Sequence, residues 1–137
     1  MAQLLVLLAA PSDEEILAAV EVWIDDLAAG DYQTAFERTA HDPYYAWSAD
    51  LIRAVVAGYG LPEAHPSGEV FAVSRRTDTP GQPFHRIVDR TAATQDEVAK
   101  VWYDLPLNGA WSDLTATFSV QQRIGHAVLV LQQIHVF

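Results

Sequence analysis

Two aspartates and a histidine in the second half of the chain could together perform acid–base chemistry. Asn108-Gly109 is a strong signal for a two-residue β-turn, because both residues tolerate the positive φ of a type I′ turn. Pairing the strands around that turn places Asp104 directly opposite Asp113. Carboxylates that face each other share a proton, bind a cation or meet a third charge. We expect His135 to provide that charge, with Asp113 as the general base and Asp104 as its modulator.

The position of His135 depends on the turn that precedes its strand. A three-residue turn within Arg123–His126 brings His135 close to Asp113. A two-residue turn places Val136 opposite Asp113 and directs His135 to the other face. Pro106 cannot donate to a strand ladder, so a bulge could also change the register. In the structural alternative, both aspartates point to solvent and Asp113 caps a bulge.

Other motifs indicate no metal and no cofactor. The chain has no cysteine, and its five histidines lack the helical spacing of a metal site. The sequence Gly58-Tyr59-Gly60 lacks the lysine and the preceding strand of a phosphate loop. His41-Asp42 is an acid–base pair or, more simply, a local turn. Four arginines could bind an anion or balance neighbouring acids: Arg75, Arg76, Arg86 and Arg90.

Composition bounds the possible partners. The 137 residues suit one domain, half of them are apolar, and 18 acidic against 8 basic side chains give a net charge of −10. This balance argues against nucleic acid and anionic membranes. Residues 1–50 hold ten acids and one base, Arg38, which we interpret as a solvated helix surface; the alternative is a docking face for a basic partner. The apolar run Leu4–Ala10 is shorter than the ~20 residues of a membrane span, so we expect it to pack on a cytoplasmic domain.

The first half of the chain has helical periodicity. Ser12–Glu15 fits a capping box, and the helix that follows should end at Gly30. Asp31 and Ser48 are expected to cap two shorter helices, with a loop over His41–Trp47 between them. The third helix should carry a periodic apolar face and end at Gly60 and Pro62; that face is Leu51, Ile52, Val55, Val56 and Tyr59.

From Gly68 onward the apolar period changes to two, which predicts strands. Helices followed by a strand meander predict one α+β domain over residues 1–137, with helices packed on one face of a mainly antiparallel sheet. The expected strands are Glu69–Arg75, Phe84–Thr91, Val98–Leu107, Trp111–Gln122 and Ala127–Phe137. The expected core is Trp23, Leu27, Phe36, Leu51, Val55 and Phe118.

The segment Trp23–Phe36, a helix end, an acidic turn and a short helix, resembles the opening of NTF2-like (SnoaL-like, cystatin-like cone) domains. Leu51–Gly60, the Ser-Asp-Leu-Thr strand in Trp111–Phe118 and the closing Ile134–Phe137 are similar to a bacterial family of unknown function. Gln133 stands where that family has an acid. The resemblance implies a curved sheet wrapped around a helix as a cone with a pocket, and sheet-to-sheet pairing as a homodimer.

Because this fold hosts several activities, the resemblance leaves the function open. We expect a non-catalytic binding module whose apolar pocket holds a small hydrophobic ligand or a protein partner. Its predicted lining is Tyr44, Tyr45, Trp47, Tyr59 and Trp102. One alternative is a small hydrolase, isomerase or dehydratase that uses a carboxylate and a histidine. Another is an acidic, immunity-type protein that neutralises a basic toxin.

Overall fold

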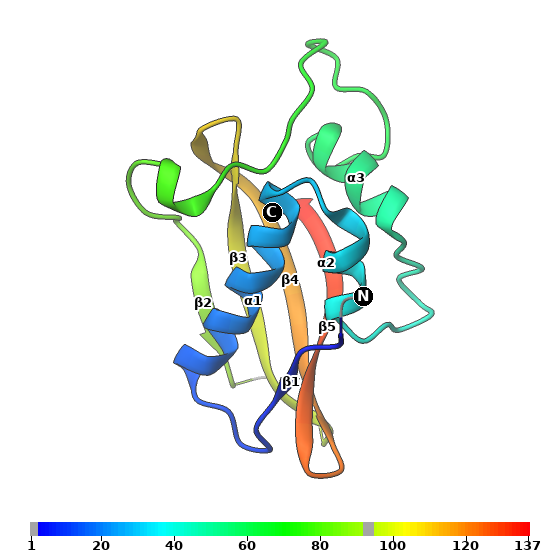
Figure 1. Ribbon diagram of the computed structural model, residues 1–137, viewed down its shortest axis with the longest axis vertical. Coiled ribbons are helices and arrows are strands. Elements are labelled where there is room, and N and C mark those ends of the chain that lie inside the picture. Colours follow the sequence, from blue (N-terminus) through cyan, green and yellow to red (C-terminus); the bar gives the residue numbers. More distant parts are fainter. Residues whose placement is uncertain (1–2, 92–94) are drawn as a thin grey trace.

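The computed structural model describes residues 3–91 and 95–137. Five antiparallel strands form one sheet in the order β1-β5-β4-β3-β2, and the sheet curls as a half-barrel with three helices packed against it (Figure 1). The predicted α+β fold is confirmed. The elements are β1 Val6–Leu7, α1 Asp13–Ala28, α2 Tyr32–Arg38, α3 Ala49–Ala57, the short 3-10 helix Arg76–Asp78, β2 Arg86–Asp89, β3 Glu97–Leu107, β4 Ala110–Arg123 and β5 His126–Val136.

Side-chain caps define where the three helices begin. The Ser12 hydroxyl accepts from the Glu15 amide, and the Glu15 carboxylate accepts from the Ser12 amide, which completes the predicted capping box. Asp31 and Ser48 accept in the same way at the starts of α2 and α3. All three predicted N-caps are therefore confirmed. The third helix is shorter than expected, because it ends at Ala57.

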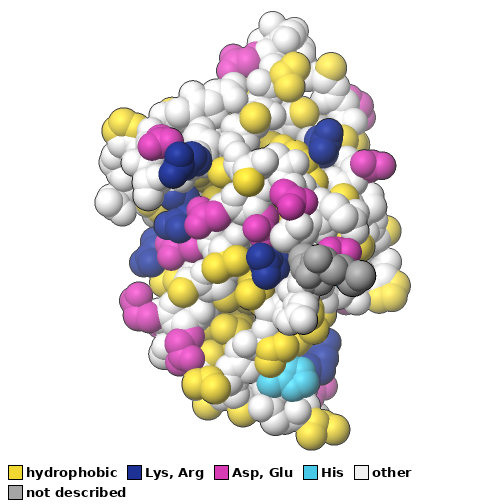
Figure 2. All heavy atoms as spheres, in the orientation of Figure 1, with side chains coloured by type: hydrophobic (Ala, Val, Ile, Leu, Met, Phe, Trp, Pro, Cys, Tyr) yellow, Lys and Arg dark blue, Asp and Glu magenta, His cyan; other side chains and the backbone are white. Residues whose placement is uncertain are grey.

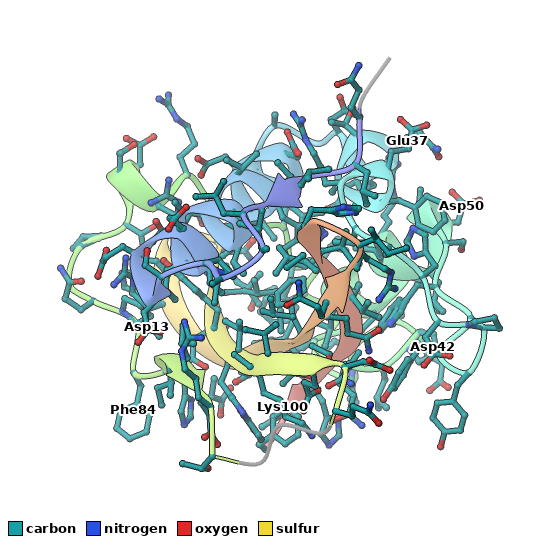
Figure 3. The ribbon with its side chains drawn as sticks, turned by 90° about the horizontal axis from the view of Figure 1, so that it is seen from below. Asp13, Glu37, Asp42, Asp50, Phe84 and Lys100 are labelled. Atoms are coloured by element: carbon teal, nitrogen blue, oxygen red, sulfur yellow. The ribbon has the colours of Figure 1, made fainter. Side chains whose placement is uncertain are left out.

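Two tight turns join the long strands. Asn108 and Gly109 have φ values of 50° and 87°, and Leu107 pairs with Ala110 across them, as predicted. Arg123 pairs with His126, so the following turn has two residues. Seen from below, the curled sheet surrounds the core, α1 and β1 lie across its open side, and Lys100 lies on its outer side (Figure 3).

The core lies between α1 and the inner face of the sheet. Trp23 is fully buried and packs edge-on against Phe118 on β4, with 5.0 Å between ring centroids. Leu27 and Val55 are buried as predicted, whereas Phe36 and Leu51 are only half-buried at its rim. Large side chains thus fill the inside of the half-barrel, where the resemblance to cone-shaped domains implied a pocket.

Two strand predictions differ from the structure. Glu69–Arg75 forms no strand. It makes only scattered hydrogen bonds to the end of β3: the Ala72 amide donates to Asn108 Oδ1 at 3.0 Å, and the Ser74 amide donates to the Pro106 carbonyl at 2.8 Å. Only an isolated bridge between Val73 and Leu107 remains. The expected strand Phe84–Thr91 is reduced to β2. The N-terminal apolar run contributes β1, which pairs with β5 and was not predicted.

Among the described residues, no helix combines the length and apolar character that crossing a membrane requires.

Candidate functional site

The strand register separates the two predicted catalytic aspartates. Asp104 pairs with Thr115, and Pro106 pairs with Trp111, so three residues of β4 lie opposite Leu105 alone. The Ser112 hydroxyl stabilises this bulge, because it donates to the Leu105 carbonyl at 2.7 Å and accepts from the Leu114 amide at 3.1 Å. The expectation that Asp104 faces Asp113 is therefore wrong.

Asp104 is a buried carboxylate whose partner is a different histidine. Only 1% of Asp104 is exposed, and its Oδ2 accepts from the His85 amide at 2.9 Å. Its Oδ1 accepts from the Thr115 hydroxyl at 2.6 Å and lies 3.0 Å from His85 Nδ1. His135 lies on the far side of Thr115, one strand further from Asp104.

Asp113 and His135 also have separate surroundings. Asp113 is exposed and accepts a hydrogen bond from the Tyr59 hydroxyl. Burial, and then this hydrogen bond, raise the pKa of Tyr59. The two-residue turn and a bulge at the Thr117–Phe118 step of β4 pair His135 with Thr115, and Val136 with Leu114. Neither predicted pairing of Asp113 with the last strand is formed.

The five predicted ligand-binding aromatics do not line one pocket. Tyr44 is 83% exposed and packs edge-on against Tyr45. Trp47 donates its indole N–H to the Gln132 carbonyl and lines an opening of about 240 Å³, while Tyr59 lines another of about 220 Å³. Trp102 lies on the outer face of the sheet, where its ring meets that of Phe137.

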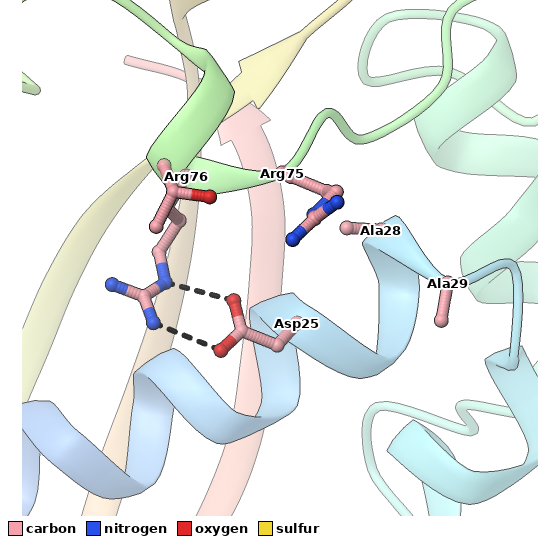
Figure 4. Close-up of a pocket in the computed structure, with 6 residues that line it drawn as sticks. Asp25, Ala28, Ala29, Arg75 and Arg76 are labelled. Carbon is pink, nitrogen blue, oxygen red and sulfur yellow. Dashed lines mark hydrogen bonds and ion pairs between the residues drawn. The ribbon is translucent and has the colours of Figure 1, made fainter.

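Four arginines pair with acids of α1, whereas Arg75 pairs with Asp78 of the 3-10 helix at 3.7 Å. Arg76 binds Asp25 with two hydrogen bonds of 2.9 and 2.8 Å (Figure 4). Arg90 pairs with Asp13 at 2.8 Å, and Arg38 with Asp26 at 3.0 Å. Figure 2 shows acidic and basic side chains interleaved over this side of the molecule. These pairs partly neutralise the acids of α1 within the chain. They favour the interpretation in which the arginines balance neighbouring acids.

The predicted acid–base pair His41-Asp42 lies in a local turn, where Asp42 accepts a hydrogen bond from the Tyr44 amide.

A polar pocket that the sequence analysis did not predict lies between α1 and the β2–β3 edge of the sheet. It has a volume of about 360 Å³ and is lined by Glu21, Arg76, Pro83, Arg86, Tyr103 and Trp111, among others. A second hollow of about 300 Å³ at the end of α1 shares Arg76 and Thr77 with it (Figure 4). We call the first of these the mouth pocket.

Glu21 is the central charge of the mouth pocket. Its Oε2 accepts from the Tyr103 hydroxyl at 2.5 Å and from Arg86 Nε at 3.2 Å, and Arg76 lies 3.7 Å away. Burial, and then the neighbouring Glu21 carboxylate, raise the pKa of Tyr103 to about 12. The phenol therefore stays neutral and donates to Glu21 at physiological pH.

The sequence contains a weak indication of the contact between Glu21 and Tyr103, because both residues lie next to buried positions. Glu21 directly follows Val20 on the buried side of α1, and Tyr103 alternates with the core residues Val101 and Leu105. A tyrosine at an inward strand position needs a partner for its hydroxyl, and Glu21 supplies it. Periodicity could indicate that need, but it could not identify the partner on another element.

Within residues 3–91 and 95–137, no three histidine, aspartate or glutamate side chains lie close enough to hold a metal ion together. Comparisons with protein-family models, with curated proteins and with solved structures found no match for this chain.

Proposed function

We propose that this protein is an NTF2-like binding module that holds a small polar ligand in the mouth pocket. Three helices ahead of the long strands, the curled sheet and the residues that resemble NTF2-like domains support this class. The observation that carries the proposal is the group formed by Glu21, Arg86 and Tyr103 at the wall of an open pocket. Ligand sites combine a concave surface with a few fixed polar groups, and this pocket has both.

Binding without turnover fits this pocket better than catalysis does. Glu21 Oε2 already accepts hydrogen bonds from the Tyr103 phenol and from Arg86, and Arg76 lies 3.7 Å away, so this oxygen is occupied by partners within the chain. The described residues that line the pocket include no histidine. His85, the histidine paired with a buried carboxylate, adjoins β2 and faces the outer side of the sheet with Asp104.

A fragment screen followed by two-dimensional NMR tests the proposal. We expect polar fragments to shift the indole N–H signal of Trp111 and the Nε–H signal of Arg86. Glu21→Gln should reduce the affinity of the fragments that bind, whereas Glu63→Gln, at an exposed acid outside the pocket, should not. Fragments that bind elsewhere, or no binding at all by a folded protein, would overturn the proposal.

We also propose that a second copy of the chain covers the outer face of the sheet. Phe137 and Ile87 are 56% and 46% exposed there, and Trp102 packs against Phe137. Tyr103 points to α1, so its neighbours on β3 point outward. A chain of net charge −10 repels its own copies, so the two should meet where acids are few. The outward rows beside Trp102 hold mainly uncharged side chains.

Sedimentation velocity tests this dimer. We expect a species of twice the 15.1 kDa chain mass at micromolar concentration, and its conversion to monomer by Phe137→Glu. Leu61→Glu, at another exposed apolar residue, is the control and should keep the dimer. A wild-type protein that sediments only as a 15.1 kDa species would refute the dimer.

A further inference from the structure

We infer that the ligand of the mouth pocket is a zwitterionic α-amino acid with an apolar or aromatic side chain. The inference rests on the proposed function, because it names the ligand class of the same site. Three features of the pocket carry it: the balance of its charges, the hydrogen-bonding groups that the protein leaves unused, and the aromatic wall beside them.

The charges at the pocket wall balance. Glu21, Arg76 and Arg86 line the pocket, and Asp25, outside this lining, pairs with Arg76 at 2.8 Å. The Glu21 carboxylate and the Arg86 guanidinium then remain as one charge of each sign. A simple anion would meet Glu21 and the field of a chain with net charge −10, and a simple cation would meet two guanidinium groups. A zwitterion carries one positive and one negative group and has no net charge. It can therefore pair with the carboxylate and the guanidinium of the pocket without either repulsion.

Unused hydrogen-bonding groups lie next to each other at this wall. The contacts that the described residues make to Glu21 all reach Oε2, which leaves Oε1 as an acceptor. Arg86 donates to Glu21 through Nε, and its guanidinium also neighbours the Tyr103 hydroxyl. Its two terminal NH₂ groups carry four N–H bonds, so donors remain for a ligand. The 3.2 Å bond from Arg86 Nε to Glu21 Oε2 keeps the acceptor and the donors together. An α-amino acid carries its ammonium and carboxylate groups on one carbon, which matches this adjacent pair.

An aromatic wall beside these groups suits the ligand's side chain. The Trp111 indole is held in place because its N–H donates to the Gly81 carbonyl at 3.1 Å. Pro83 and the Tyr103 ring line the same volume of about 360 Å³. Such a volume lies in the ordinary range for small-molecule sites and holds one amino acid with its side chain.

Calorimetric titration of the wild-type protein with L-phenylalanine and three relatives tests the inference. L-phenylalanine methyl ester lacks the carboxylate, N-acetyl-L-phenylalanine lacks the ammonium group, and 3-phenylpropionate lacks the amine. Each should bind at least about tenfold more weakly than L-phenylalanine, because a hydrogen bond between charged groups is lost. Equal binding of the zwitterion and its derivatives would overturn the inference. These measurements need no variant and so do not depend on whether a variant folds.

Two variants then assign the contacts. Arg86→Gln should weaken the binding of L-phenylalanine. It should leave the affinity of the methyl ester nearly unchanged, because the ester has no carboxylate for Arg86 to bind. Glu21→Gln should weaken the binding of L-phenylalanine and leave the affinity of N-acetyl-L-phenylalanine nearly unchanged, because the acetylated compound has no ammonium group for Glu21 to bind. If other fragments occupy the mouth pocket while amino acids do not, the ligand class is wrong and the proposed function stands. If nothing binds there, both are wrong.

Discussion

The Tyr103 hydroxyl joins the core to the mouth pocket and should dominate the alkaline behaviour of the protein. Its pKa of about 12 lies above the ordinary phenol value of about 10, so the folded state favours the neutral form. The stability that this preference contributes is complete below about pH 10 and is lost as the pH rises toward 12. We expect Tyr103→Phe to reduce the fall in the free energy of unfolding between pH 10 and 12, measured by denaturant titration at each pH. Tyr44→Phe, at an exposed phenol, should keep the wild-type decline.

Asp104 should stabilise the fold through its hydrogen bonds. Its carboxylate accepts from the His85 amide and the Thr115 hydroxyl and contacts the His85 ring. Asp104→Asn replaces an acceptor oxygen by a donor NH₂ group and should lower the free energy of unfolding by about 1–3 kcal/mol. Asp113→Asn, at an exposed carboxylate, should cost well under that amount. Equal urea midpoints for the two variants would contradict the role of Asp104.

At the scale of elements, the turn after α3 depends on a glycine for steric reasons. Gly58 has a φ of −91°, which any residue can adopt, but an added Cβ would lie 2.1 Å from the Leu61 carbonyl oxygen. Gly58→Ala should therefore move the following turn and cost about 1–3 kcal/mol. We expect the NMR signals of Tyr59 and Asp113 to shift with it. Gly30→Ala, where the added Cβ meets nothing within 4 Å, should leave those signals in place despite its own conformational cost.

The elements themselves were largely predictable, because local chemistry decides them. Side-chain caps at Ser12, Asp31 and Ser48 and the Asn108-Gly109 turn act within a few residues, and all are formed. The bulge opposite Leu105 was not predictable in the same way, since it depends on where a serine hydroxyl finds its partners. Two extra residues in one strand were enough to separate Asp104 from Asp113.

The mouth pocket was not predicted either, because it is formed by segments that are distant in the sequence. Its principal side chains come from α1, from the 3-10 helix and the loop after it, and from β2, β3 and β4. Periodicity shows which face of a strand is buried, but not which distant segment closes over its end. The sequence therefore indicated a four-arginine cluster and an acidic helix without showing that the two lie against each other.

At the scale of the whole molecule, the chain has a net charge of −10, but several acids of α1 are paired with arginines. Asp25 is held by both nitrogens of the Arg76 fork, so Asp25→Lys replaces an ion pair by a repulsion. Because Asp25 is half exposed, we expect a loss of at most about 1 kcal/mol, which salt should reduce. Glu63→Lys changes the net charge equally at an exposed site and should leave the melting temperature nearly unchanged. Equal melting temperatures for both variants at low salt would contradict the pairing.

The pairing of β1 with β5 has a consequence for how the chain folds during its synthesis. Val6 pairs with Val128, so β1 leaves the ribosome long before its partner strand has been made. α1 follows β1 directly, and its apolar face is covered by strands that are made later, including β4 and its Phe118. Contacts this distant in sequence form slowly, because the intervening chain must first be ordered. We expect a nascent chain that lacks β5 to keep that face accessible to chaperones, and the half-barrel to close in one late step.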